Sequence, residues 1–209
     1  SLDTFDRDKF EQITGRDLFG KVRENMDALL DAGIPFKLNA VAMRGFNDDE
    51  LPAFIDYAMR HPIDVRFIEF MPMGEGTRWS DSCFWPAPDI LDAVKGLVSV
   101  APVEQGQRSG GPARLYALSG PDGPGLGRLG LITPLSSHFC TDCNRLRITS
   151  DGALRTCLFD DREYRLRNAL RHPRLGIEAV RRIVTLATRD KPIGARLLER
   201  RHNAVAQRR

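Results

Sequence analysis

Three of the four cysteines of this chain fall within the short stretch 138–159. They are Cys140, Cys143 and Cys157, in the spacing Cys-x2-Cys-x13-Cys. Such a set can hold a zinc ion, an iron–sulfur cluster or no metal at all. Zinc would need a fourth ligand, either His138, Cys83 or a distant histidine, whereas three thiolates around a cluster would leave one iron open to an outside ligand. The spacing favours a cluster with an open position, and we expect Cys83, the fourth cysteine, to be a plain buried or half-buried thiol.

The residues between the second and third cysteines predict a β-hairpin. Arginine and threonine alternate with leucine and isoleucine over 145–149, which is the period of a half-buried strand, and Asp151-Gly152 is a strong turn signal. If Ser150 faces Ala153, Cys157 lies opposite Leu146. The third cysteine would then return close to the second.

A second group of candidate residues is basic and lies on two expected strands. Lys37 and Asn39 share one face of the first strand, and Arg66 lies on the next. Strands of a parallel sheet between helices are normally apolar, so two cations there need a nearby anion. That anion is either Glu69 or a bound phosphate or carboxylate.

Two further arginines, Arg145 and Arg147, extend this basic group. Their forked donors suit a phosphate or the edge of a purine, so a nucleotide is the favoured ligand class. The alternative is that both simply face solvent. Met71 directly follows the strand of Arg66, at the end where α/β folds place their sites, although a methionine there can equally be a packing residue.

The elements that must position these residues alternate between helix and strand. Periodicity predicts a helix over 17–32, with Asp17 as N-cap and Gly33 beyond its end, and a strand over 36–45. Asn47 and Glu50 predict a capping box that starts a helix ending at Arg60, and 65–70 predicts the next strand. This order is typical of parallel strands with crossover helices.

The second half of the chain is less regular. A long loop is expected over 71–87, a short helix over 88–97, and strands over 113–118 and 130–133. Two helices, about 162–171 and 175–188, are expected to close the fold. Residues 193–209 have weak periodicity and predict a mobile basic tail.

The composition is that of a soluble globular protein, with 42% hydrophobic and 28% charged residues. No apolar run approaches the roughly 18 residues that a membrane span needs, which excludes a membrane protein. Few cysteines and no secretory signal favour a reducing, cytoplasmic location. The net charge of +3 hides a basic end, because residues 161–209 carry 14 Lys and Arg against 5 Asp and Glu. Scattered arginines of this kind are typical of a solvated helix face.

With these residues assigned, the chain resembles the GTP 3′,8-cyclases of molybdenum cofactor biosynthesis, which are radical S-adenosylmethionine enzymes. The resemblance is nearly continuous from residue 1 to about 192. It is carried by SLDTFD at Ser1, KLNAVAMRGFNDDE at Lys37, RFIEFMPMG at Arg66, GRLGLITPLSSHFCTDCNRLRIT at Gly127 and DGALRTCLF at Asp151. The cysteine motif followed by NRLR is specific to that family.

The resemblance implies an α/β fold, the second half of a partial TIM-like (βα)6 barrel followed by an α+β extension that carries an iron–sulfur cluster. It implies that residues 1–75 belong to the barrel, 76–192 form the extension and 193–209 form the tail. By position, Cys140, Cys143 and Cys157 would hold a [4Fe–4S] cluster whose free iron meets guanine.

The resemblance also implies the binding residues and the reaction. Lys37, Arg66, Arg145, Leu146 and Arg147 match GTP-contacting positions, and Ser1 and Met71 match positions that contact S-adenosylmethionine. Reductive cleavage of S-adenosylmethionine would give a radical that converts GTP to (8S)-3′,8-cyclo-7,8-dihydroguanosine 5′-triphosphate. The implied partner downstream is cyclic pyranopterin monophosphate synthase; a homodimer stays open, and neither membrane nor nucleic acid is expected.

Two departures from the family pattern shape these expectations. The Cys-x3-Cys-x2-Cys segment, which holds the S-adenosylmethionine cluster in the full-length enzymes, does not occur in residues 1–209, and the C-terminal Gly-Gly is replaced by an end in Ala206-Gln207-Arg208-Arg209. We therefore expect the C-terminal portion of a cyclase, inactive alone. A half-barrel would also expose a sheet edge, which predicts aggregation or pairing with a separate N-terminal half. The alternative function is a zinc-binding nucleic-acid module built from the three cysteines and His138.

Overall fold

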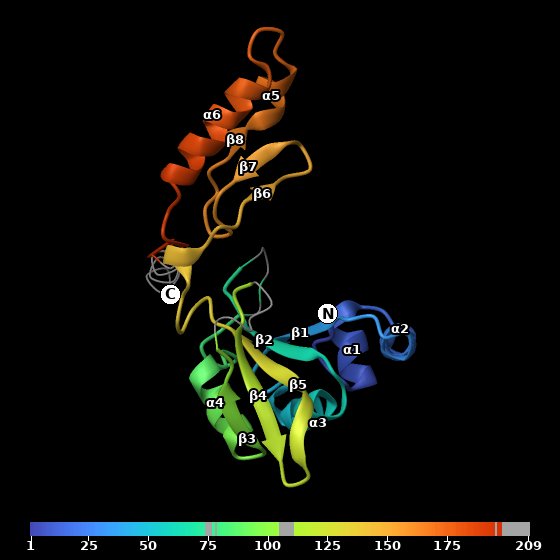
Figure 1. Cartoon of the computed structure of the whole chain (residues 1–209). Helices are drawn as coiled ribbons and strands as arrows, with labels where there is room; N and C mark the ends of the chain where they lie inside the picture. The colour runs from blue at the N-terminus through green and yellow to red at the C-terminus, as the bar shows by residue number, and fades with distance from the viewer. Residues whose placement is uncertain (74–76, 78, 105–110, 195, 198–209) are drawn as a thin grey trace. The chain divides into compact units, whose positions relative to one another are not determined.

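The computed structural model describes residues 1–73, 77, 79–104, 111–194 and 196–197, and it divides the chain into two compact units. Unit 1 comprises Ser1–Ser137 and unit 2 comprises His138–Arg209. Figure 1 shows the elements of both units. Each unit is described separately below.

Unit 1 is built on a five-stranded mixed sheet in the order β1-β2-β5-β4-β3. The strands are β1 Lys37–Ala42, β2 Asp64–Glu69, β3 Ser99–Pro102, β4 Arg114–Gly120 and β5 Gly123–Ile132. β1, β2 and β5 run parallel to one another, whereas β4 and β3 are antiparallel additions. The helices of unit 1 are α1 Arg7–Thr14, α2 Phe19–Asp31, α3 Leu51–Arg60 and α4 Ala87–Lys95, with a 3-10 turn η1 at Asp48–Glu50.

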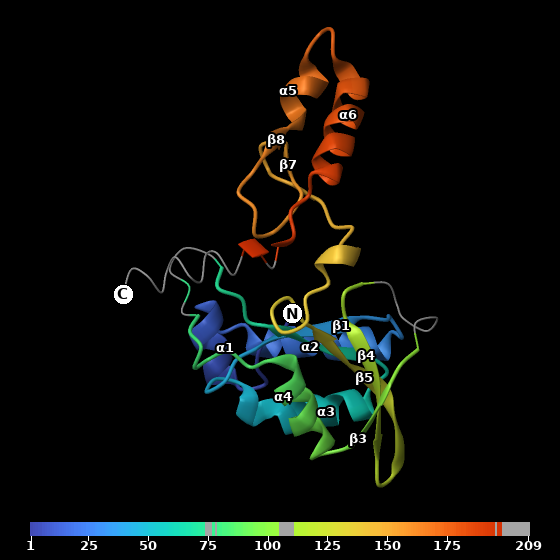
Figure 2. The ribbon, with the colours of Figure 1, turned by 90° about the vertical axis from the view of Figure 1, so that its left-hand side faces the viewer.

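One face of the sheet forms the core, because every second residue along the parallel strands is apolar and points to that face. Leu38 and Ala40 of β1, Val65 and Phe67 of β2, and Leu129 of β5 are all at most 3% exposed. They pack against apolar residues of α3 and α4, and these two helices lie on the same side of the sheet in Figures 1 and 2. The alternation expected for strands with one covered face is therefore present. The opposite face carries the charged residues described with the site and, next to them, a small apolar cluster in which Val103, Ala113 and Leu115 pack against Ile132.

The predicted alternation of helices and strands in unit 1 is confirmed, but two of the predicted helix N-caps were wrong. Asp17 does not cap α2, which begins after Leu18 with no side-chain cap; Asp17 instead pairs with Arg7. The helix α1 was not anticipated, although it has ordinary signals: Asp6 caps its N-terminus by accepting from two backbone N–H groups, and Gly15 ends it at φ +69°.

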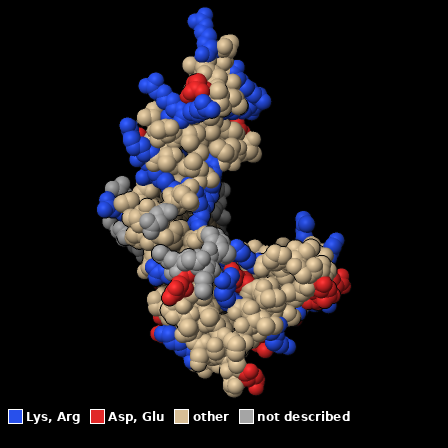
Figure 3. Space-filling model, viewed as in Figure 1, with Lys and Arg blue, Asp and Glu red and all other residues tan. Residues whose placement is uncertain are grey.

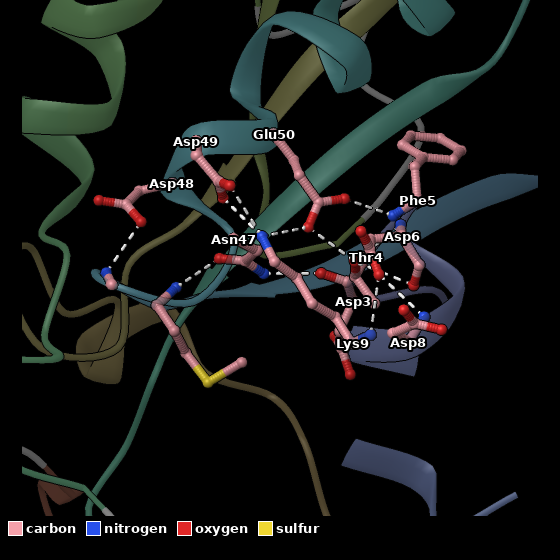
Figure 4. Close-up of polar contacts among 12 residues, drawn as sticks. Asp3, Thr4, Phe5, Asp6, Asp8, Lys9, Asn47, Asp48, Asp49 and Glu50 are labelled. Atoms are coloured by element: carbon pink, nitrogen blue, oxygen red, sulfur yellow. Dashed lines mark hydrogen bonds and ion pairs between the residues drawn. The ribbon is translucent and has the colours of Figure 1, made fainter. Parts of the chain in front are cut away.

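The predicted capping box at Asn47 and Glu50 was also wrong, because both side chains serve the N-terminal segment instead. Asn47 is fully buried; its amide donates to the Asp3 and Val41 carbonyls, and its oxygen accepts from Met43 N–H at 2.9 Å. Figure 4 shows Glu50 reaching the Thr4 hydroxyl and the Phe5 N–H. The two residues thus fasten the start of the chain to the turn after β1.

The N-terminal segment also covers part of the outer edge of β1. Leu2 N–H donates to the Asn39 carbonyl at 3.0 Å, and the Asp3 carboxylate accepts from Val41 N–H at 2.7 Å. Edge strands covered in this way are less prone to pair with other chains. The exposed edge expected from the sequence is therefore partly blocked, and the predicted aggregation or pairing stays a prediction.

Unit 2 has a small antiparallel sheet, β6 Arg147–Ile148, β7 Ala153–Arg155 and β8 Tyr164–Arg165, followed by α5 Leu166–Arg171 and α6 Gly176–Arg189. The hairpin β6–β7 is confirmed, but its register differs by one residue from the prediction. Arg147 pairs with Arg155, and Thr149 N–H donates to the Ala153 carbonyl. Asp-Gly occupies the last two positions of a three-residue loop, with Gly152 at φ +83°, rather than a two-residue turn. The strand is also not half-buried, because Leu146 is 40% and Ile148 is 63% exposed.

The described structure is a mixed α/β fold in which no closed barrel occurs. The half-barrel stays a proposal about the longer enzymes that the chain resembles, and the boundaries 1–75, 76–192 and 193–209 stay predictions. Most of the predicted tail, residues 198–209, lies outside the described residues, as do Ala206–Arg209. Among the described helices, none combines the length and the apolar character that crossing a membrane requires.

Candidate functional site

The polar face of the parallel strands carries the first candidate site. In the strand register, Lys37 of β1 lies beside Asp64 of β2, and Asp64 lies beside Arg128 of β5. Two residues further along each strand, Asn39 lies beside Arg66, and Arg66 lies beside Gly130. Partners in register point to the same face of a sheet. The three predicted residues Lys37, Asn39 and Arg66 are therefore neighbours on one surface.

Asp64 is the anion that the buried cation on this face requires. Asp64 is 5% exposed and accepts from Arg66 Nη2 at 2.8 Å and from Arg128 Nε at 2.7 Å. Arg66 is itself only 8% exposed. The interpretation of Glu69 as its partner was wrong, because Glu69 points to the other face.

Gly130 makes room for Arg66 on this face. A Cβ at position 130 would lie 2.7 Å from Arg66 Cγ, which real structures do not tolerate. The charged residues of this face on β1, β2 and β5 are Lys37, Arg66, Arg128 and Asp64, so its formal charge is +2. Such a surface suits a polyanion. Asp64 and Arg128 were not predicted as site residues, although each lies two positions before a residue that shares its face, Arg66 and Gly130.

Glu69 closes the end of β2. It is 1% exposed, and its carboxylate accepts from Ala87 N–H at the start of α4 and from the N–H groups of Leu135 and Ser136, each at 2.9 Å. The Ser136 hydroxyl also donates to it. Glu69 thus joins β2, α4 and the loop that precedes unit 2.

The two residues predicted to contact S-adenosylmethionine flank this region of unit 1. Ser1 is exposed and precedes Leu2, whose N–H bonds to β1; Met71 is half-buried and follows β2 by two residues. Their role stays a prediction.

In unit 2, the first two candidate cysteines share one turn. Cys140 begins the 3-10 turn η3, Cys140–Asp142, and Cys143 N–H donates to its carbonyl. Lys191, which follows α6, donates through Nζ to the Cys143 carbonyl at 2.7 Å, to the Arg145 carbonyl at 2.9 Å and to Cys143 Sγ at 3.3 Å. Burial by itself would raise the pKa of the Cys143 thiol, but a hydrogen bond from the Arg145 backbone and the nearby Lys191 outweigh it, so the pKa lies below its usual value.

The third cysteine lies against the same segment after α6. A Cβ on buried Gly194 would lie 2.8 Å from Cys157 Sγ. Lys191 and Gly194 therefore bring Cys143 and Cys157 to one short segment. Within the described part of the chain, no three His, Cys, Asp or Glu side chains are arranged to hold a metal ion.

Neither suggested fourth ligand is placed for that role by a described contact. Cys83 belongs to unit 1, where its half-buried thiol donates to the Ser80 carbonyl at 3.1 Å, as expected of a plain thiol. His138 is the exposed first residue of unit 2.

The predicted nucleotide contacts in unit 2 lie beside the cysteine turn. The Arg145 guanidinium stacks 5.1 Å from the centre of the Phe139 ring, and its carbonyl is held by Lys191. Leu146 and Arg147 follow and are exposed. Lys37 and Arg66, the other predicted GTP contacts, belong to unit 1. Lys191 and Gly194 were missed, since nothing in their spacing points to the cysteines.

The two units differ in charge. Residues 1–137 carry 14 Lys and Arg against 20 Asp and Glu, whereas residues 138–209 carry 17 against 8. In Figure 3, basic side chains gather over α5 and α6 of unit 2. Within the described residues, the basic end predicted from the sequence is thus largely the surface of these two helices.

The chain has relatives among known proteins. Residues 63–197 match the family described as Molybdenum Cofactor Synthesis C. The chain is 43% identical over 194 residues to the GTP 3′,8-cyclase of Alkaliphilus oremlandii, covering 92% of this chain and 57% of that protein. It is 40% identical over 193 residues to that of Syntrophomonas wolfei (92% and 57%) and 39% identical over 201 residues to that of Pelotomaculum thermopropionicum (95% and 60%). The chain spans less than two thirds of the length of these curated relatives. It belongs to the Molybdenum Cofactor Synthesis C family and is homologous to the GTP 3′,8-cyclases.

Proposed function

We propose that this chain supplies the GTP-binding and second-cluster part of a GTP 3′,8-cyclase in molybdenum cofactor biosynthesis. The observation that carries the proposal is the polar face of unit 1, where Arg66 is buried beside Asp64 and Lys37 stands on the neighbouring strand. Asp64 balances only one of the three cations on this face, so the face keeps a formal charge of +2, which favours an anionic ligand. The homology to GTP 3′,8-cyclases supports GTP as that ligand.

Of the proposed GTP contacts, Lys37 and Arg66 belong to unit 1, whereas Arg145, Leu146 and Arg147 belong to unit 2. Arginine binds phosphate through two parallel hydrogen bonds, while lysine acts as a compact positive charge. Asp64 keeps the Arg66 guanidinium in one orientation, since its Oδ2 accepts from Nη2. Ser1 and Met71 are proposed to contact S-adenosylmethionine.

The donor set of unit 2 fits the proposed [4Fe–4S] cluster in its chemistry. Cys140, Cys143 and Cys157 are soft thiol ligands, one of them approached by a cation that stabilises the thiolate form. The missing side chain at Gly194 leaves space beside Cys157 Sγ. When bound, a cluster with three thiolate ligands would offer one iron to substrate. A zinc site remains the competing outcome of the test.

Metal analysis tests the cluster. After anaerobic reconstitution, we expect about four iron and four sulfide per chain, with strong losses in Cys140→Ser, Cys143→Ser and Cys157→Ser. Cys83→Ser is the matched control and should keep the full content, because the Cys83 thiol belongs to unit 1, where it donates to the Ser80 carbonyl and accepts from the Ser80 N–H. Equimolar zinc without iron and sulfide would refute the proposal.

Nucleotide binding and cofactor cleavage test the rest. We expect weak GTP binding by residues 1–209, reduced about tenfold by Lys37→Ala, which is one lost phosphate contact. Lys21→Ala, on exposed α2, is the control. Because residues 1–209 contain no Cys-x3-Cys-x2-Cys segment, this polypeptide should release no 5′-deoxyadenosine from S-adenosylmethionine under reduction. Equal GTP affinity in Lys37→Ala and Lys21→Ala, or release of 5′-deoxyadenosine, would contradict these expectations.

A further inference from the structure

We propose that the segment Lys191–Gly194, immediately after α6, is a supporting wall of the cysteine site that sets the redox properties of its cluster. Lys191 would be a fixed cationic donor to one ligand sulfur, and Gly194 would leave the room that a second ligand sulfur needs. This inference rests on the proposed cluster function of Cys140, Cys143 and Cys157.

The Lys191 ammonium is matched to its surroundings. An ammonium has three N–H donors, and the structure offers three acceptors: the carbonyl oxygens of Cys143 and Arg145 and Cys143 Sγ. A long flexible side chain loses rotamer entropy when it is fixed in this way, so one that forms three bonds serves a defined position. Lys191 therefore holds the backbone on both sides of Asn144 while it donates to the sulfur.

Gly194 provides the second, independent observation. Its hypothetical Cβ would lie 2.8 Å from Cys157 Sγ and 2.8 Å from Phe159 Cδ2, so any side chain would displace the third cysteine. Between the two contacts stands Pro192, whose ring fixes φ and stiffens the segment. A short stiff segment thus touches two of the three proposed ligands from one side.

The chemical consequence follows from charge. A reduced cluster carries one more negative charge than an oxidised one, and hydrogen bonds and positive charge near its sulfur ligands raise the reduction potential. Lys191 should therefore favour the reduced form. Through the Arg145 carbonyl, the same ammonium also positions a residue proposed to bind GTP, which links the redox centre to the nucleotide contact.

The test is a redox titration of the reconstituted chain, followed by electron paramagnetic resonance. In Lys191→Met we expect the ratio of reduced to oxidised cluster at a fixed applied potential to fall about tenfold, which is about 59 mV for a one-electron couple. Arg189→Met removes the same charge two residues earlier, where the exposed guanidinium pairs with Asp190, and should leave the ratio nearly unchanged. Lys191→Arg should restore most of the ratio because the charge returns.

The outcomes separate the two proposals. If wild type binds no iron and sulfide, the proposed function fails. If all variants bind a full cluster and Lys191→Met titrates like Arg189→Met, the cluster stands and the role of Lys191 is overturned. Loss of the cluster in Lys191→Met with retention in Lys191→Arg supports the role; loss in both together with loss of the circular dichroism of folded unit 2 would make Lys191 a folding residue only and overturn it.

The rate of iron release to a chelator tests the part assigned to Gly194. We expect Gly194→Ala to release iron to a chelator several-fold faster than wild type, because its methyl group displaces Cys157 Sγ. Gly20→Ala on α2, where no atom lies within 4 Å of the added Cβ, is the control. Equal release rates in the two variants would overturn the part assigned to Gly194.

Discussion

Replacing Glu69 with glutamine should cost unit 1 about 3 kcal/mol, because this buried carboxylate is surrounded by donors alone. Its two oxygens accept four hydrogen bonds, from the N–H groups of Ala87, Leu135 and Ser136 and from the Ser136 hydroxyl. Among the described residues no Lys or Arg pairs with it, so its charge is balanced by backbone dipoles, including the N-terminus of α4. Glutamine keeps the shape and replaces one acceptor oxygen by an NH2 donor.

The magnitude can be worked from these contacts. If the amide oxygen takes Leu135 and Ser136 N–H, the NH2 group faces Ala87 N–H and the Ser136 hydroxyl. The hydroxyl can rotate to accept, but the Ala87 N–H is left buried without an acceptor, at about 1–3 kcal/mol. The two remaining backbone bonds lose their ionic character, at about 0.5–1 kcal/mol each. The sum is about 3 kcal/mol, a large share of the total stability of a domain.

The assay is urea unfolding followed by tryptophan fluorescence. Both tryptophans, Trp79 and Trp85, lie in unit 1, so the signal reports this unit alone. With a slope of about 2 kcal/mol per molar urea, the midpoint should fall by about 1.5 M. Glu24→Gln, on an exposed position of α2, is the control and should shift the midpoint by little.

The reasoning would be refuted by a midpoint shift in Glu69→Gln no larger than that in Glu24→Gln. It would also be refuted if amide hydrogen exchange at Ala87, Leu135 and Ser136 stayed as slow as in wild type, because these are the N–H groups that the carboxylate protects.

Three further predictions concern positions where the structure leaves little freedom. Gly130→Ala should lower the stability of unit 1 by about 1–3 kcal/mol, because the added methyl group would displace Arg66 from Asp64. The same urea unfolding assay measures the effect, with Gly20→Ala as the control, and an unchanged midpoint would contradict the close contact at Arg66 Cγ. Asn47→Ala should cost about 2–4 kcal/mol, because three backbone groups lose their buried partner, and a melting temperature equal to wild type would speak against it. Gly152→Ala should destabilise unit 2 by about 1–2 kcal/mol from its positive φ alone, visible in thermal unfolding followed by circular dichroism, whereas an unshifted melt would disprove the three-residue hairpin loop.

The sequence predicted the alternating elements of unit 1 because their burial follows a simple period. The strands around Lys37 and Arg66 and the helix ending at Arg60 occur as expected. The predicted capping box was wrong because the side chains of Asn47 and Glu50 form hydrogen bonds to the N-terminal segment instead of to each other's backbone N–H groups. Their partners there are Asp3, Thr4 and Phe5. A local pattern cannot weigh a partner more than 40 residues away.

The candidate site was predictable in kind and not in detail. The period of two placed Lys37 and Asn39 on one face, and the structure bears this out; the strand register adds Arg66 to the same face. Glu69 was wrong as the counter-ion, and alternation along β2 argues against it, because Asp64 shares the face of Arg66 and Glu69 does not. The hairpin register failed by one residue because Asp-Gly suits both two-residue and three-residue loops, and only the backbone conformation at Gly152 decides between them.

The opposite charges of the two units bear on how a triphosphate could be bound. Unit 1 has a net formal charge of −6, yet its polar face, with Lys37, Arg66, Arg128 and Asp64, carries +2. At physiological salt, charges more than about 8 Å away are largely screened, so the face and not the net charge governs close binding. At low salt the acidic remainder of unit 1 would oppose an anion, whereas unit 2, with +9, would attract it. Lowering the salt should therefore strengthen nucleotide binding through unit 2 and not through unit 1.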